Sequence, residues 1–135
     1  MDQLPPSLFN PQAADAEAQG LLQPTAEDLP SLIAGWSGPR PLRVCSGGTS
    51  SRAAAEGQWT LDLRRTMTGI TWNAADQTVR IGGGCRMGQV LEQLHPLGRT
   101  VSAGLSGWPG VGYVLTGGMG PLSREQGLAV DQLQA

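Results

Sequence analysis

The sequence predicts an α+β fold in which helices pack against a mixed β-sheet. Strand-like and helix-like segments follow one another in the order β-α-β-loop-β-β-β-α-β, which is neither strictly alternating nor all-β. Glycine (20 residues) and proline (10 residues) exceed a fifth of the 135-residue chain and interrupt real apolar runs, which indicates many functional loops and not disorder. A chain of this length forms one small domain or a piece of a larger one.

The chain divides into an N-terminal arm and a folded domain. Residues 1–20 hold three prolines and scattered acidic residues without periodicity, so we expect a flexible arm there. Residues 21–135 carry the periodic segments and form the predicted domain. Because neither a signal peptide nor an apolar run of about 18 residues is visible, we expect a cytoplasmic protein without membrane contact.

The strands and helices are predicted from apolar spacing. A strand over 21–23 ends at Pro24, and Thr25 then suits a helix N-cap with Asp28 as its capping-box partner. The helix that follows carries a stripe at Leu29, Leu32 and Ile33 and is closed by residues 35–39. Further along, we expect strands over 42–45 and 59–63, a hairpin over 69–81, a helix over 87–94 ended by 95–98, and a short strand at 100–101.

Several function classes are not supported by the composition. The net charge is −2 without any cluster of basic residues, so no nucleic-acid partner is expected. Cys45 and Cys85 fit either reduced thiols or a single disulfide, and we expect reduced thiols. Neither has a CxxC partner, so redox catalysis by cysteine is not predicted. His95, the only histidine, has no Cys or acidic cluster nearby, so no metal site is predicted. The acidic residues show no pairing typical of acid–base catalysis, and the catalytic residues stay unassigned.

The first glycine-rich loop covers 45–52 and directly follows a predicted strand. Glycine adopts positive φ freely, so consecutive N–H groups there can point into one concavity. Hydroxyl side chains surround the same spot, at Ser46, Thr49, Ser50 and Ser51. Such a loop suits a phosphate or pyrophosphate, although the residues alone fit a polar turn between strands equally well.

The second glycine-rich loop covers 102–121 and contains seven glycines. This length and density are excessive for a simple connector, and small residues allow backbone to lie flat against a planar or phosphate-bearing ligand. A purely structural loop is the alternative. Trp108 is the one tryptophan that we expect could stack on a ligand, because it lies inside this loop.

A third glycine cluster, within 81–88, does not have the dinucleotide-binding spacing of a Rossmann fold. With Gly82 and Gly84 as the first pair, Met87 stands where the third glycine or alanine belongs. The cluster is therefore predicted to be a tight strand-to-helix turn, and a nicotinamide-binding Rossmann enzyme is disfavoured.

Five segments taken together resemble a known family. Residues 41–50 (PLRVCSGGTS), 61–67 (LDLRRTM), 79–84 (VRIGGG), 103–120 and 122–133 occur in the order and spacing of the FAD-binding (PCMH-type) domain of the vanillyl-alcohol-oxidase superfamily, which includes the berberine-bridge-enzyme-like proteins. The resemblance covers about residues 21–133.

The resemblance implies FAD as the cofactor, with its pyrophosphate and ribityl region between the two glycine-rich loops. The contacts that it implies are Ser46, Gly47, Gly48, Thr49, Ser50, Ala103, Gly104, Ser106, Gly110, Gly112, Thr116, Gly117 and Gly118. It further implies an oxidoreductase whose flavin N5 accepts a hydride from an alcohol, a hydroxy acid or a sugar-like substrate. That small-molecule substrate would be bound by a domain outside this chain. The alternative is a non-catalytic remnant or binding module that retains the fold.

Two departures from the family pattern concern how the flavin is held. Many members carry a flavin-linked histidine where Thr49 stands, and berberine-bridge-type members add a cysteine where Ser106 stands. Neither side chain forms the usual link, so noncovalent FAD is predicted. The chain ends at Ala135, where the family would begin its next strand, and we expect the FAD-binding domain to be incomplete at this end.

Overall fold

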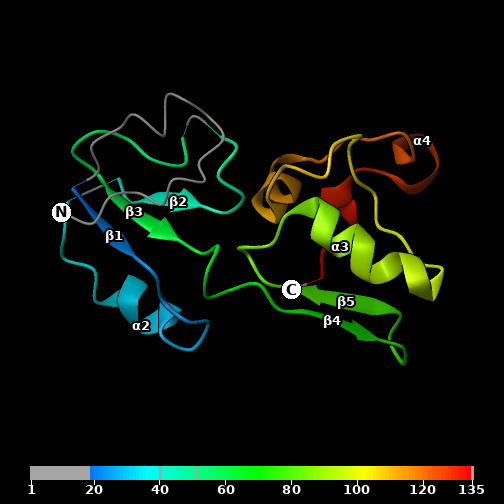
Figure 1. Ribbon diagram of the computed structural model, residues 1–135, viewed down its shortest axis with the longest axis horizontal. Coiled ribbons are helices and arrows are strands. Elements are labelled where there is room, and N and C mark those ends of the chain that lie inside the picture. The colour runs from blue at the N-terminus through cyan, green and yellow to red at the C-terminus, as the bar shows by residue number, and fades with distance from the viewer. Residues whose placement is uncertain (1–18, 40, 51, 135) are drawn as a thin grey trace.

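The computed structural model describes residues 19–134 except residues 40 and 51. Most of the predicted arm over 1–20, and Ser51 of the first glycine-rich loop, lie outside the described residues. Gln19 and Gly20 belong to the fold, because the Gln19 amide donates a 3.0 Å hydrogen bond to the Gln58 carbonyl. Figure 1 shows two lobes, one built on a parallel sheet and the other on a β-hairpin covered by a helix.

The first lobe is a three-stranded parallel sheet. Its strands are β1 (Gly20–Leu22), β3 (Trp59–Asp62) and β2 (Arg43–Cys45), in the order β1-β3-β2. The last three residues of β3 are all buried. The alternation expected from the sequence of β3 therefore gives way to burial on both faces, as is typical of a central parallel strand.

Helix α2 (Leu29–Ala34) follows β1 and begins later than predicted. Asp28, and not Thr25, occupies the N-cap position. Pro30 explains the shift, because proline lacks an N–H and is favoured in the first helical turn. The predicted partners still meet in the preceding turn, where the Asp28 amide donates to Thr25 Oγ1 at 3.2 Å and the Thr25 hydroxyl donates to the Asp28 carboxylate at 2.6 Å.

The second lobe contains the predicted hairpin and the second predicted helix. Strands β4 (Ile70–Asn73) and β5 (Thr78–Ile81) pair antiparallel, with Ile70 opposite Ile81. Helix α3 (Met87–Leu94) packs against this hairpin. The core between them consists of Cys85, Val90 and Leu94, with Ile70, Trp72, Val79, Ile81, Val101 and Val111 packed around it. The apolar spacing that predicted α3 thus marks its buried face.

Short helical turns make up most of the remainder. They are the 3-10 helices η1 (His95–Leu97), η2 (Val111–Thr116) and η3 (Ala129–Gln132), together with the one-turn helix α4 (Ser123–Gln126). The strand predicted at 100–101 is wrong. Val101 packs its side chain into the core of the second lobe, and no strand of the described chain pairs with this segment.

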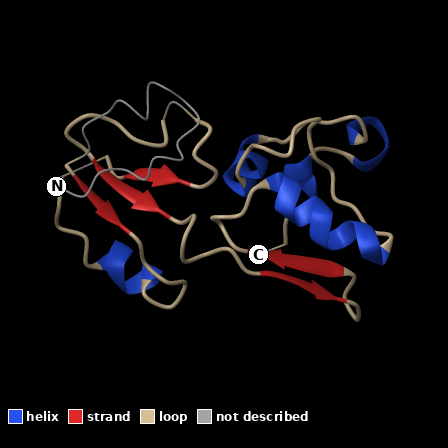
Figure 2. Ribbon diagram, in the orientation of Figure 1, coloured by secondary structure: helices blue, strands red, loops and turns tan. Residues whose placement is uncertain are grey.

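The α+β class is confirmed, with parallel and antiparallel pairing in two separate sheets (Figure 2). Both cysteines are free thiols and are buried. Among the described helices, none has the length and apolar character needed to cross a membrane.

Candidate functional site

The two glycine-rich loops meet at Gly47 and Gly110. A Cβ added to Gly47 would overlap the backbone nitrogen and Cα of Gly110, and a Cβ added to Gly110 would overlap the same atoms of Gly47. Both residues are buried. Only glycine permits this approach, which we call the loop crossing, and it joins segments that the sequence analysis singled out independently.

Ser46 ties the loop crossing to the third glycine cluster. Its hydroxyl donates a hydrogen bond to the Gly83 carbonyl and accepts a 3.1 Å hydrogen bond from the Gly112 amide. The single hydroxyl proton of Ser46 is therefore used within the protein, and the predicted contact of Ser46 with the cofactor stays a prediction.

The second loop is held against the start of α3. The Met87 amide donates to the Pro109 carbonyl at 2.9 Å, the Gly88 amide to the Gly107 carbonyl at 2.9 Å, and the Val111 amide to the Cys85 carbonyl at 2.9 Å. The N-terminal amides of α3 that make these bonds cannot bind an anion as they do in a Rossmann fold. The prediction of a strand-to-helix turn within residues 81–88 is confirmed, since β5 ends at Ile81 and α3 begins at Met87.

Two backbone donors lie at the loop crossing. Within the described part of the chain, the amides of Gly47 and Gly110 make no backbone hydrogen bond. Gly110 faces Arg86 in an antiparallel bridge whose hydrogen bonds are made by the neighbouring residues, so its own amide is directed away from Arg86. A buried amide that lacks an acceptor is costly, and a bound anion would satisfy it.

A positive charge adjoins the second loop. The guanidinium of Arg86 lies 5.5 Å from the centroid of the Trp108 ring. Trp108 is 58% exposed, and on the same loop Leu105 and Met119 are 95% and 73% exposed. These apolar side chains are open to solvent, whereas the glycine backbone at position 110 meets the first loop.

The other predicted contacts occupy different environments. Gly48 is buried at φ 77°, Thr49 is half-buried, and Ser50 is exposed with its Oγ accepting a hydrogen bond from the Arg52 amide. Ala103 is buried, Gly104 is half-buried, and exposed Ser106 accepts a hydrogen bond from the Trp108 amide.

Residues Thr116–Gly118 pack toward η3 and not into the loop crossing. The Gly118 carbonyl accepts a 3.0 Å hydrogen bond from the Ala129 amide, and the Gly117 carbonyl accepts one of 3.1 Å from the Val130 amide. Thr116 donates to the Tyr113 carbonyl at 2.7 Å. The structure thus brings Ser46–Gly48 together with Gly110–Gly112, whereas the contact predicted for Thr116–Gly118 stays a prediction.

A buried ion pair lies where the parallel strands end. Asp62 has a fully buried side chain and accepts hydrogen bonds from Arg64 Nε at 2.9 Å and the Arg64 amide at 3.1 Å, with Gln23 Nε2 at 3.5 Å. Burial would raise the pKa of Asp62, but the hydrogen bonds and charge of Arg64 outweigh it and hold this pKa below its usual value. This role was not predicted, because an acidic residue in a strand that alternates apolar and polar side chains is normally exposed.

Cys45 connects this ion pair to the first loop. It lies opposite Asp62 in the pairing of β2 and β3, and its carbonyl accepts a 3.0 Å hydrogen bond from the Leu63 amide. Burial raises the pKa of the Cys45 thiol to about 11, and nearby Arg64 only partly offsets this. The thiol is thus neutral at ordinary pH, and a neutral thiol is a poor nucleophile.

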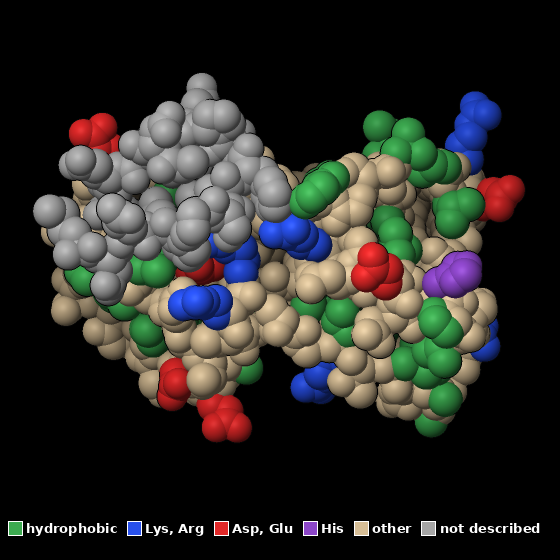
Figure 3. All heavy atoms as spheres, viewed as in Figure 1, with side chains coloured by type: hydrophobic (Ala, Val, Ile, Leu, Met, Phe, Trp, Pro, Cys, Tyr) green, Lys and Arg blue, Asp and Glu red, His purple; other side chains and the backbone are tan. Residues whose placement is uncertain are grey.

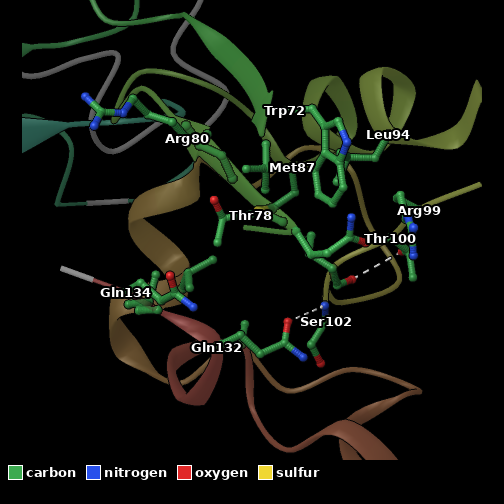
Figure 4. Close-up of a pocket in the computed structure, with 17 residues that line it drawn as sticks. Trp72, Thr78, Arg80, Met87, Leu94, Arg99, Thr100, Ser102, Gln132 and Gln134 are labelled. Atoms are coloured by element: carbon green, nitrogen blue, oxygen red, sulfur yellow. Dashed lines mark hydrogen bonds between the residues drawn. The ribbon is translucent and has the colours of Figure 1, made fainter. Parts of the chain in front are cut away.

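A separate hollow of about 790 Å³ lies in the second lobe (Figure 4). Trp72 and Leu94 lie at one end and Gln132 and Gln134 at the other, with Gln132 accepting a 3.1 Å hydrogen bond from the Ser102 amide. None of residues 46–50 lines it. This hollow is distinct from the loop crossing and was not predicted, because β5, residues 99–102 and η3 come together only in the tertiary structure.

The surface visible in Figure 3 carries basic and acidic side chains interspersed with one another. Within the described residues, no group of three or more His, Cys, Asp or Glu side chains could hold a metal ion.

The loop crossing brings backbone donors of two loops together, and the positive charge of Arg86 adjoins the second loop. This combination suits a phosphate-bearing ligand.

Comparison with known proteins decides which ligand class this is. The family model described as an FAD binding domain matches residues 21–135, which is most of the chain. The chain belongs to the FAD-binding domain family. No curated protein matches the sequence in a direct comparison.

Solved structures of flavin-family oxidases share the fold of this FAD-binding domain. The 6-hydroxy-D-nicotine oxidase of Arthrobacter nicotinovorans is 28% identical, with a TM-score of 0.76 over 88% of this chain and 28% of that chain. GilR, an oxidoreductase solved in complex with pregilvocarcin, is 29% identical, with a TM-score of 0.72 over 88% of this chain and 25% of that one. A chitooligosaccharide oxidase is 30% identical, with a TM-score of 0.60 over 67% of this chain and 20% of that one.

These comparisons confirm the predicted relationship to the vanillyl-alcohol-oxidase and berberine-bridge-enzyme-like proteins. The FAD-binding domain spans about a quarter of the length of the solved structures that it matches.

Proposed function

We propose that this domain binds FAD noncovalently through the loop crossing and serves an oxidoreductase acting on an alcohol, a hydroxy acid or a sugar-like substrate. The observation that carries the proposal is the contact of Gly47 with Gly110, whose buried amides make no backbone hydrogen bond within the part of the chain that the structure describes. A diphosphate supplies several anionic oxygens at the spacing of successive amides, so it matches such a cradle.

The residues fit a diphosphate better than a neutral ligand. Glycine at positions 47 and 110 removes the side chains that would keep a phosphate away from the backbone. The Gly47 and Gly110 amides would donate to phosphate oxygens, and Arg86 would add positive charge at the second loop. Bound FAD supplies a ring that accepts a hydride, and this chain contributes the binding and orientation of that ring.

Noncovalent attachment is proposed from Thr49 and Ser106. Thr49 is half-buried and Ser106 is exposed, and each carries a hydroxyl where family members carry a flavin-linked side chain. Acid precipitation of the FAD-loaded protein should release all flavin into the supernatant. Colour retained in the washed pellet would contradict this part of the proposal.

A matched pair of variants at Gly48 tests the site. Gly48 has a φ of 77°, which Asn and Asp tolerate better than other side chains. Gly48→Asn and Gly48→Asp therefore impose similar backbone strain and bulk but differ by one negative charge. Repulsion of a diphosphate at an effective dielectric of about 20 should weaken FAD binding by Gly48→Asp at least about tenfold relative to Gly48→Asn.

Binding is measured by quenching of flavin fluorescence during titration with the purified chain. Wild type should bind FAD and the Asp variant should bind it more weakly than the Asn variant. Equal affinities for the two variants would remove the first loop from the site. A wild-type chain that ignores FAD altogether would favour the alternative function, a non-catalytic module that retains the fold.

The substrate class is proposed from the names of the solved structures, which include oxidases of a chitooligosaccharide and of 6-hydroxy-D-nicotine. In a longer protein that contains this domain, an anaerobic panel of sugars, alcohols and hydroxy acids should bleach the bound flavin with at least one member. Absence of bleaching with every member would argue against oxidation of these substrates.

A further inference from the structure

We infer that the Ser46 hydroxyl is a positioning group that fixes the diphosphate cradle by joining three glycine segments. This inference rests on the proposed function. Ser46 is hydrogen-bonded to Gly83, 37 residues further along the chain, and to Gly112, 66 residues further along. One side chain thus connects the first loop, the turn before α3 and the second loop.

The hydrogen-bonding capacity of Ser46 supports this role. A serine hydroxyl has one proton and two lone pairs. The proton goes to the Gly83 carbonyl and one lone pair accepts from the Gly112 amide, so no proton is left for a phosphate oxygen. Ser46 therefore acts on the ligand through the backbone that it holds and not through its own hydroxyl.

The packing around Ser46 shows why this bond fixes the loop crossing. A Cβ on Gly110 would meet Ser46 Oγ at 2.6 Å, and a Cβ on Gly112 would meet Ser46 Cβ at 3.2 Å. The hydroxyl thus lies directly against the two glycines on either side of Val111. When a cradle is already ordered before binding, less conformational entropy is lost on binding, and the affinity rises.

Ser46→Ala tests the inference because it removes only the hydroxyl. The matched control is Thr66→Val, which removes a hydroxyl that donates to the Pro24 carbonyl 42 residues away. Affinities for FAD, ADP and riboflavin are measured for wild type and both variants, together with their melting temperatures. Riboflavin lacks the diphosphate, so it reports on the flavin contacts alone.

Ser46→Ala should weaken binding of FAD and of ADP about tenfold, which corresponds to about 1.4 kcal/mol, and leave riboflavin binding unchanged. Thr66→Val should leave all three affinities unchanged even if it lowers the melting temperature. Equal losses of affinity for all three ligands would show a general structural role and overturn the inference. So would losses of FAD affinity that are proportional to the fall in melting temperature in both variants.

Amide hydrogen exchange of the ligand-free protein separates failure of this inference from failure of the proposed function. Exchange of the Val111 and Gly112 amides, which are hydrogen-bonded in the ligand-free protein, should accelerate in Ser46→Ala and not in Thr66→Val. Unchanged exchange would overturn the positioning role even if wild type binds FAD. Accelerated exchange in a chain that binds neither FAD nor ADP would show that Ser46 orders the loops but would overturn both the proposed function and the link to a cradle.

Discussion

Replacing Gly110 with alanine should separate the two glycine-rich loops. The new Cβ would overlap the backbone of Gly47, and backbone cannot rotate away as the end of a flexible side chain can. Gly69→Ala is the matched control, because a Cβ there meets nothing within 4 Å and Gly69 does not adopt positive φ. The control should be neutral or slightly stabilising.

The magnitude follows from the hydrogen bonds made by residues 109–112, which move when Gly110 is displaced. The displacement breaks three of them, from the Met87 amide to the Pro109 carbonyl, from the Val111 amide to the Cys85 carbonyl and from the Gly112 amide to Ser46 Oγ. At about 1 kcal/mol each, their loss lowers the free energy of unfolding by about 3 kcal/mol. For a domain of this size, that corresponds to a fall in melting temperature of about 10 °C.

Calorimetry measures the stability of both variants, and fluorescence titration measures their affinity for FAD. Gly110→Ala should melt well below Gly69→Ala and bind FAD at least about tenfold more weakly, because the Gly47 and Gly110 amides no longer converge. If Gly110→Ala kept both the melting temperature and the FAD affinity of Gly69→Ala, the loop crossing would be neither structural nor part of the binding site.

Three further predictions concern the first lobe. Asp62→Asn should lower the free energy of unfolding by about 1–3 kcal/mol at neutral pH, because it removes the charge that accepts the Arg64 hydrogen bonds at a fully buried position. Because the pKa of Asp62 is lowered in the folded state, its contribution to stability is present above about pH 4 and is lost as the pH falls through the folded-state pKa. In denaturant unfolding, the free energies of unfolding of the variant and wild type should therefore differ at pH 7 and converge at pH 3. Thr60→Val should be neutral or stabilising by up to about 1 kcal/mol, because Thr60 Oγ1 is buried without a hydrogen-bond partner in the described structure. A clear fall in the free energy of unfolding would instead show that the hydroxyl has a partner. Cys45 is 1% exposed with its pKa raised to about 11, so iodoacetamide should modify it only after denaturation, and rapid labelling of the native protein at about pH 8 would disprove its burial.

Local sequence patterns predicted most of the elements of the fold. The stripe from Met87 to Leu94 specified α3 because apolar side chains at helical spacing form one buried face. The turn between β4 and β5 was predicted over residues 73–76, because two strand-like runs flank them. The strand predicted at 100–101 failed, because a strand exists only where a partner supplies hydrogen bonds and two residues carry no information about a partner.

The candidate site was predicted in part. Glycine density marked both loops, because glycine is selected where the backbone must approach another group closely. The buried role of Asp62 could not be predicted, since the same carboxylate would be exposed if β3 were an edge strand. The hollow beside β5 gave no signal either, because its lining comes from segments that are distant along the chain.

The sequence by itself determined the α+β class, the two glycine-rich loops and the family motifs, because these depend on residue type and on spacing between near neighbours. Tertiary structure alone decided that Gly47 meets Gly110 and that the Ser46 hydroxyl is used within the protein. It also placed Asp62 and Arg64 in a buried pair. The physical reason is that each of these features depends on which long-range partner fills the space beside a residue, and that partner is set by the packing of the whole chain.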